Sequence, residues 1–156
     1  MLKLGFHEDW VRLIVACVTT ASYSIMVNGE PKGYVRPQCG LRQGDPLSPY
    51  LFLLCAKGLS ALFWKAKRDS LIRGISISQG GPRISHLFFA DDSIVFCKAI
   101  NANCAELQQL LSVYANVSGQ VVNTQKTVIF FFSYNTSQTC RDSICSILGT
   151  NPTKQF

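Results

Sequence analysis

Residues 84–97 read ISHLFFADDSIVFC, the most informative stretch of the chain. Two runs of β-prone apolar residues meet at a short polar step, a pattern that predicts a β-hairpin. Because each run is a nearly continuous series of Leu, Ile, Val and Phe, we expect both faces of the hairpin to be buried. The step between the runs holds two adjacent carboxylates, Asp91 and Asp92.

Two carboxylates at the tip of an apolar hairpin repel each other and lose hydration, which is costly unless a cation lies between them. Oxygen ligands without a His or thiolate partner suit Mg²⁺ or Mn²⁺ rather than zinc. An Asp-Asp pair is also a good turn dipeptide that simply solvates a hairpin tip. Taken alone, the pair leaves both a metal site and a plain turn open.

A second informative stretch, GLRQGDPLSP at residues 40–49, leads into a predicted helix. Ser48 suits the N-cap, and Pro49 suits the first helical position. A glycine-containing loop before a helix presents free N–H groups to an anion and lets a ligand approach the main chain. An ordinary structural loop is the alternative interpretation of this segment.

Three motifs together indicate a family. The loop at residues 40–49, the FADD tetrad at 89–92 and the run SGQVVNTQK at 118–126, in that order and at these intervals, resemble the reverse transcriptase domain of plant non-LTR (LINE-type) retrotransposons. The resemblance covers essentially the whole chain. It implies an RNA-directed DNA polymerase, whose palm contains these segments as the motifs conventionally lettered B, C and D.

The resemblance also implies the roles of individual residues. Asp91 and Asp92 would be the catalytic and metal-binding carboxylates, holding Mg²⁺ (or Mn²⁺). In this family, two such ions about 3.5–4 Å apart would activate a primer hydroxyl and neutralise the leaving pyrophosphate. The partners would be an RNA template, a DNA primer and deoxynucleoside triphosphates. The implied nucleotide- and template-binding residues are Arg42, Gln43, Gly44, Phe89, Ala90 and Lys126.

A further aspartate, which this family carries on an earlier strand, has no candidate among the nine Asp and Glu residues of the chain. We therefore expect that strand to precede Met1. Residues 1–5 support this, because they read as the last turn of a helix closed by Gly5. The sequence thus predicts a partial palm domain over residues 1–156, lacking the fingers, the first catalytic strand and the thumb, and inactive alone.

Composition is typical of one folded domain, since 47% of the 156 residues are hydrophobic and 15% are charged. No apolar stretch reaches the length of a bilayer span, so we expect no membrane partner. Seven cysteines without a Cys-x-x-Cys motif favour reduced thiols and an intracellular protein. Nuclear action is implied only through the resemblance, and the sequence leaves the oligomeric state open.

The formal charge of +6 favours polyanionic partners. Five basic residues along and after the second helix could follow a phosphate backbone, although a solvated helix face explains them equally. We find no aromatic residues interleaved with them in a base-stacking motif. The five are Lys57, Lys65, Lys67, Arg68 and Arg73.

The fold class expected is α+β: a reverse-transcriptase palm-like antiparallel sheet with helices packed on one side, incomplete. The predicted helices span residues 9–20, 49–68, a segment carrying Leu107 to Tyr114 that stops near 118–119, and a last one around 144–148. The predicted strands lie at 22–28, near 34–35, near 75–77, in the hairpin at 84–97 and at about 127–132. A turn at Asn28-Gly29 is predicted to join the first two.

Two other functions stay open. The chain could be a non-catalytic nucleic-acid-binding remnant or a domesticated module, whose salt-sensitive binding would survive Asp91→Ala. A fragment of a group II intron maturase would share the palm fold. The residues around 40–49 and 118–126 favour the LINE-type interpretation over the maturase.

Overall fold

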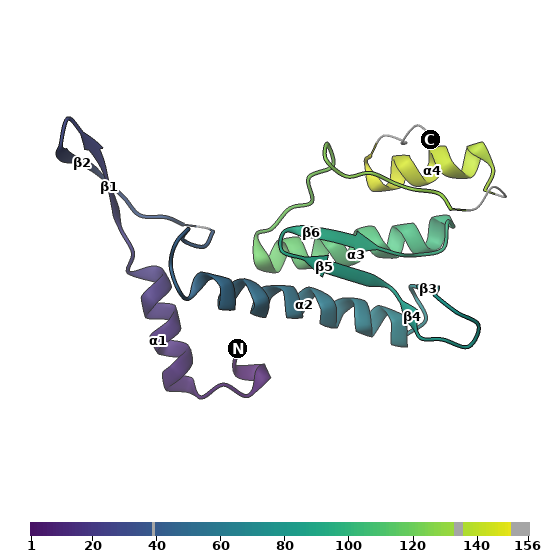
Figure 1. The fold of residues 1–156 in the computed structure, drawn as a ribbon, viewed down its shortest axis with the longest axis horizontal. Coiled ribbons are helices and arrows are strands. Elements are labelled where there is room, and N and C mark those ends of the chain that lie inside the picture. Colours follow the sequence, from purple (N-terminus) through teal and green to yellow (C-terminus); the bar gives the residue numbers. More distant parts are fainter. Residues whose placement is uncertain (39, 133–135, 151–156) are drawn as a thin grey trace. The chain divides into compact units, whose positions relative to one another are not determined.

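The computed structural model describes residues 1–38, 40–132 and 136–150 and has an α+β architecture (Figure 1). Across these residues, helices alternate with three separate two-stranded antiparallel sheets. The chain divides into two compact units, Met1–Leu54 and Cys55–Phe156. The expected α+β class is therefore confirmed.

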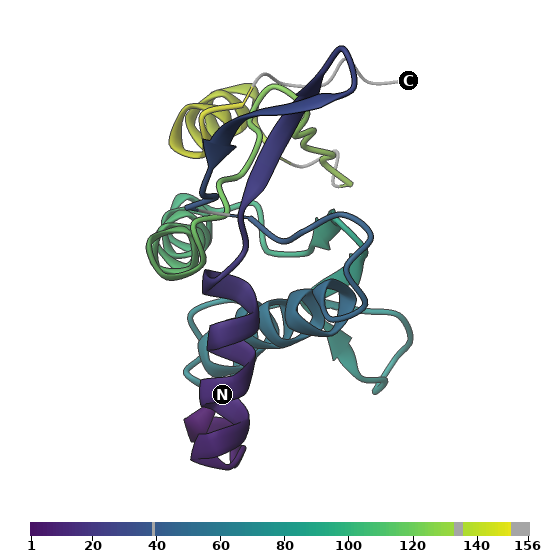
Figure 2. The same ribbon diagram turned by 90° about the vertical axis from the view of Figure 1, so that its left-hand side faces the viewer.

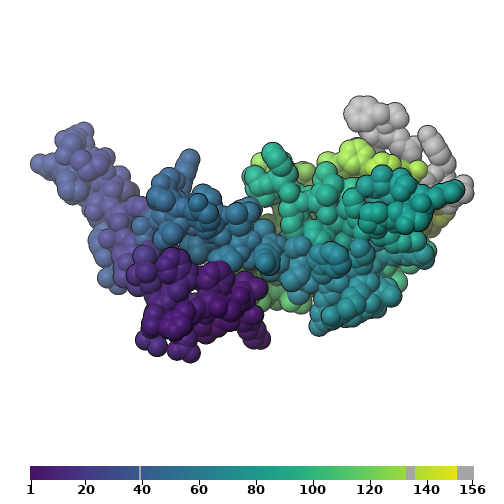
Figure 3. Space-filling view, turned by 60° about the horizontal axis from the view of Figure 1, so that its bottom comes forward, coloured from purple at the N-terminus to yellow at the C-terminus, as the bar shows by residue number. Residues whose placement is uncertain are grey.

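The first unit contains a short 3₁₀ helix, an α-helix and a hairpin. These are η1 (Leu2–Leu4), α1 (Glu8–Thr19), β1 (Tyr23–Val27) and β2 (Glu30–Val35). The predicted turn is confirmed, because Asn28 and Gly29 both have positive φ, at 52° and 83°, as a tight hairpin turn requires. Every residue of β1 and β2 is exposed, and the hairpin stands clear of the rest of its unit in the space-filling view (Figure 3).

The long helix α2 (Ser48–Arg68) begins in the first unit and continues in the second. The predicted helix is confirmed, but Ser48 is its first residue and not the residue before it. The side chain of Asp45 instead satisfies a free amide at this end, because the Leu47 N–H donates to Asp45 Oδ1 over 2.8 Å.

The second unit places two hairpins and two further helices around α2. The hairpins are β3 (Ile75–Ser76) with β4 (Arg83–Ile84), and β5 (His86–Phe89) with β6 (Asp92–Val95); the helices are α3 (Asn101–Ser118) and α4 (Gln138–Leu148). Both ribbon views place α3 between α2 and α4 (Figures 1 and 2). As predicted, α3 ends at a glycine, because Gly119 takes the left-handed conformation with φ 72°.

The core of the second unit joins α2, α3 and the β5–β6 hairpin. Phe63 and Ala66 of α2 are buried with Ile72 and with Leu107 of α3. Phe88 of β5 packs against this cluster, together with residues of β6 and α4. Helices thus cover one face of the hairpin.

Three expectations are wrong. The hairpin is not buried on both faces, because Leu87, Phe89 and Ile94 are 50%, 83% and 55% exposed. The described strands form separate pairs and not one sheet. Residues 127–132 form no strand, and only Ile129 makes an isolated bridge. Apolar β-prone residues need a neighbouring strand to pair with, and propensity alone does not supply one.

Candidate functional site

The two adjacent carboxylates lie at the tip of the β5–β6 hairpin. Phe89 pairs with Asp92, so Ala90 and Asp91 form a two-residue loop. Ala90 adopts φ 49°, a left-handed conformation that costs free energy in any residue with a Cβ atom. The tight turn therefore holds the Asp91 and Asp92 backbones next to each other at a defined place on the unit.

The base of the hairpin is anchored on α2 through His86 and Phe88. The His86 ring stacks on Phe63 with centroids 4.8 Å apart, and Phe88 contacts the same ring edge-on at 6.1 Å. Ser60 Oγ lies 2.9 Å from His86 Nε2, and Ser85 Oγ lies 3.0 Å from Nδ1. These contacts connect the carboxylate tip to the core through the strand β5.

His86 has a structural role in this arrangement, as its ring contacts indicate. Burial, followed by the charge of Lys67, lowers the pKa of His86 from its ordinary 6.5. Both ring nitrogens already have a serine hydroxyl as partner. The neutral imidazole is the form that this surrounding stabilises.

The side chains of Asp91 and Asp92 are solvent-exposed and, across the described residues, neither makes an ion pair or a side-chain hydrogen bond. Free carboxylate oxygens are the ligands that Mg²⁺ and Mn²⁺ prefer, so the donor chemistry of the pair fits these ions. In the part of the chain that the structure describes, no third His, Cys, Asp or Glu joins the pair to form a metal-binding cluster.

The glycine loop of the first unit holds the other predicted binding residues. The Arg42 guanidinium donates a hydrogen bond to the Cys17 carbonyl near the end of α1 and lies 3.6 Å from the Asp45 carboxylate. Gln43 and Gly44 are exposed, and Gly44 has φ 81°. Arg42 thus ties the loop to α1, whereas Gln43 and Gly44 stay open to a ligand.

Lys126 lies in a turn that Asn123 organises. The Asn123 side chain accepts hydrogen bonds from the backbone amides of Gln125 and Lys126, at 3.1 and 3.2 Å. Lys126 is exposed. The turn fixes the backbone from which the lysine extends and leaves its ammonium group accessible.

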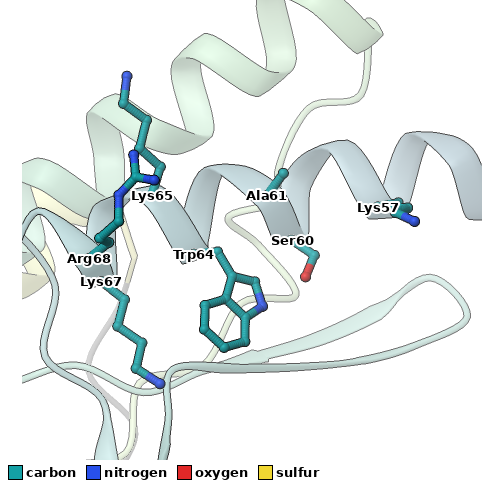
Figure 4. Close-up of a pocket in the computed structure, with 7 residues that line it drawn as sticks. All are labelled: Lys57, Ser60, Ala61, Trp64, Lys65, Lys67 and Arg68. Carbon is teal, nitrogen blue, oxygen red and sulfur yellow. The ribbon is translucent and has the colours of Figure 1, made fainter. Parts of the chain in front are cut away.

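An exposed tryptophan on α2 was missed by the sequence reasoning. Trp64 lies in a surface hollow with a cavity volume of about 820 Å³, and four of the five predicted basic residues line the same hollow (Figure 4). Lys67 Nζ lies 4.9 Å from the centre of the indole ring. No base-stacking motif was expected from the sequence, and the structure shows that Trp64 nevertheless lies among these basic residues. The helical spacing between Lys57, Trp64 and Lys67 was the available signal.

Two comparisons with known proteins bear on this site. A family model described as reverse transcriptase (RNA-dependent DNA polymerase) matches residues 2–151. An uncharacterized mitochondrial protein of Arabidopsis thaliana is 54% identical over 68 residues, which is 44% of this chain and 56% of that protein. The chain thus aligns with little more than half the length of this relative.

Proposed function

Because the chain belongs to the reverse transcriptase (RNA-dependent DNA polymerase) family, we propose that the β5–β6 tip is its metal-binding catalytic element. The observation that carries this proposal is the hairpin tip itself. Asp91 and Asp92 are adjacent and exposed, and among the described residues their side chains make no hydrogen bond or ion pair. The other end of their hairpin is packed into a core.

In the proposed reaction, Asp91 and Asp92 hold divalent cations where a primer end and a nucleoside triphosphate meet. The bound ions would lower the pKa of the attacking hydroxyl and offset the charge of the leaving pyrophosphate. Mg²⁺ is commonly held by one or two carboxylates together with substrate phosphates. Two carboxylates alone would therefore bind the ion weakly, and the triphosphate would complete its coordination.

The remaining predicted residues have supporting positions in this scheme. Phe89 is 83% exposed directly before the loop, where an incoming nucleotide could contact it. Lys126 offers a solvent-accessible ammonium group for phosphates. Gln43 and Gly44 would contact nucleotide and template, and Arg42 would act chiefly by positioning their loop through Cys17 and Asp45.

The first test measures the binding of Mn²⁺ in the presence of a deoxynucleoside triphosphate. The readout is the paramagnetic relaxation of water protons by the bound ion. We expect the wild-type chain to bind the Mn²⁺–nucleotide complex and Asp91→Asn with Asp92→Asn to lose most of that binding. Asp142→Asn is the control, because it removes an exposed carboxylate that lies on the helix α4 and not on the hairpin. Equal binding by the double variant and the wild type would refute the metal site.

A primer-extension assay tests activity separately. We propose that this chain alone extends no primer, because no further carboxylate from another element joins the pair among the residues that the structure describes, and a two-ion clamp needs one. Template-dependent synthesis with Mg²⁺ or Mn²⁺ would contradict that part of the proposal while leaving the metal site intact.

The motifs at residues 40–49 and 118–126 support a more specific proposal, that the chain derives from a non-LTR, LINE-type element. Such an element would act inside the cell, at nuclear DNA. The name of the Arabidopsis relative places that protein in mitochondria. Fluorescence microscopy of the tagged chain in plant cells distinguishes the two compartments, and exclusively mitochondrial signal would contradict nuclear action.

A further inference from the structure

The face of α2 around Trp64 consists of residues that do not belong to the carboxylate hairpin. Trp64 is 62% exposed, although a ring of this size is normally among the more buried side chains. Trp64 is flanked by Ser60 and Lys67 on the same helix (Figure 4). The core-facing side of the helix carries Phe63 and Ala66. The packing of this unit therefore does not account for a tryptophan at position 64.

The charge of this face is one-sided. The helix α2 contains four basic residues and no Asp or Glu over its 21 residues. Arg68 lies 3.5 Å from Asp69, just after the helix, and Lys67 donates a hydrogen bond to the Arg83 carbonyl at 2.7 Å. Basic residues in a last helical turn also complement the helix dipole, which explains Lys65, Lys67 and Arg68 but explains neither Lys57 nor the exposed indole.

Aromatic and cationic groups are combined here in one element. Lys67 Nζ lies over the indole ring, 4.9 Å from its centre, and Trp64 remains 62% exposed, so a positive charge and an accessible aromatic ring are combined at one place. Lys57 lies ten residues before Lys67, which corresponds to about 15 Å along a helix. A short run of phosphates could therefore contact both lysines while a base stacks on Trp64.

We propose that this face of α2, centred on Trp64 with Lys57 and Lys67, binds a few nucleotides of single-stranded nucleic acid. Single strands are favoured because only an unpaired base offers its face to an aromatic ring. An acidic peptide would match the lysines but would leave the indole without a partner, so charge and ring together favour the nucleic acid. The proposal does not depend on the carboxylate hairpin.

The experiment uses tryptophan fluorescence in a Trp10→Phe background, which leaves Trp64 as the single tryptophan of the chain. Titration with a short oligothymidylate should quench the emission, because a stacked base contacts the indole. An abasic oligonucleotide of the same length should bind more weakly and quench little. Quenching by polyglutamate equal to that by oligothymidylate, or no quenching by either, would overturn the proposal.

Anisotropy of a labelled oligothymidylate measures affinity in the variants. Trp64→Ala should weaken binding about fivefold or more, as loss of one base–aromatic stack does. Lys57→Gln should lower the slope of log K against log salt by about 0.7, the value for one phosphate contact on a single strand. Unchanged affinity in Trp64→Ala would overturn the proposal.

Two further variants separate this site from other effects. Lys32→Gln, on β2 of the first unit, removes the same charge elsewhere and should leave the affinity within twofold. Asp142→Asn, on the exposed side of α4, removes a carboxylate that belongs to neither proposed site and should also leave the affinity unchanged. A loss of affinity in Lys32→Gln equal to that in Lys57→Gln would show that net charge alone drives binding and would overturn the site.

Discussion

At the scale of single residues, His86 couples stability to pH. Its pKa in the folded chain is lowered, chiefly by burial and further by Lys67, from the ordinary 6.5. The unfolded chain therefore takes up a proton first as the pH falls below 6.5, and the free energy of unfolding decreases from there down to the folded pKa. We expect urea midpoints to be lower at pH 5.5 than at pH 8.

His86→Gln should remove most of this difference between pH 8 and pH 5.5, because an amide does not titrate. His7→Gln, at the exposed N-cap of α1, is the matched control and should retain it. If His86→Gln and the wild type showed the same pH dependence, the buried imidazole would not be its source.

Ala90 stores strain in the carboxylate loop. Its φ of 49° is unfavourable for a β-branched side chain above all, so Ala90→Val should lower the free energy of unfolding by about 1–3 kcal/mol. Ala90→Gly is the matched variant and should leave stability unchanged or slightly raised, since glycine adopts this conformation without strain. Chemical denaturation of the two variants measures the difference, and equal stabilities would contradict it.

At the scale of elements, the β5–β6 hairpin has one packed and one open face. Phe88 packs against the core beside Phe63, whereas Phe89 is 83% exposed. Because Phe88 is partly buried, Phe88→Ala should cost about 2–3 kcal/mol, and Phe89→Ala should stay within about 0.5 kcal/mol. Thermal unfolding of both variants tests this, and a comparable loss from Phe89→Ala would show that its face is covered in solution.

At the scale of the whole chain, the amount of exposed apolar surface predicts self-association. On β1, Ile25 and Met26 are 62% and 63% exposed, and the buried apolar core of the described residues is small. Large apolar patches on a surface favour association. We expect the chain to bind a hydrophobic dye strongly and to sediment as a mixture of oligomers.

Ile25→Thr with Met26→Thr should reduce both the dye fluorescence and the oligomeric fraction, because threonine keeps the β propensity of the strand. Asn28→Ala with Gly29→Ala is unsuitable as a control, since it disrupts the turn. Thr19→Ser, on the exposed end of α1, changes no apolar patch and should leave sedimentation unchanged. A monodisperse wild-type chain would contradict the prediction.

Features that depend on neighbouring residues could be predicted from the sequence. Helical periodicity and a terminal glycine predicted α3, Asn28 and Gly29 predicted their turn, and the FADD tetrad predicted the hairpin with its carboxylate tip. Each of these follows from local conformational preference and side-chain period, which are readable along the chain.

Which surfaces contact each other became clear from the three-dimensional structure. It left one face of β5–β6 open, kept residues 127–132 from forming a strand and turned Arg42 toward the Cys17 carbonyl. It also exposed Trp64 beside Lys67. Burial and strand pairing depend on partners far away in sequence, so composition and propensity leave them undetermined.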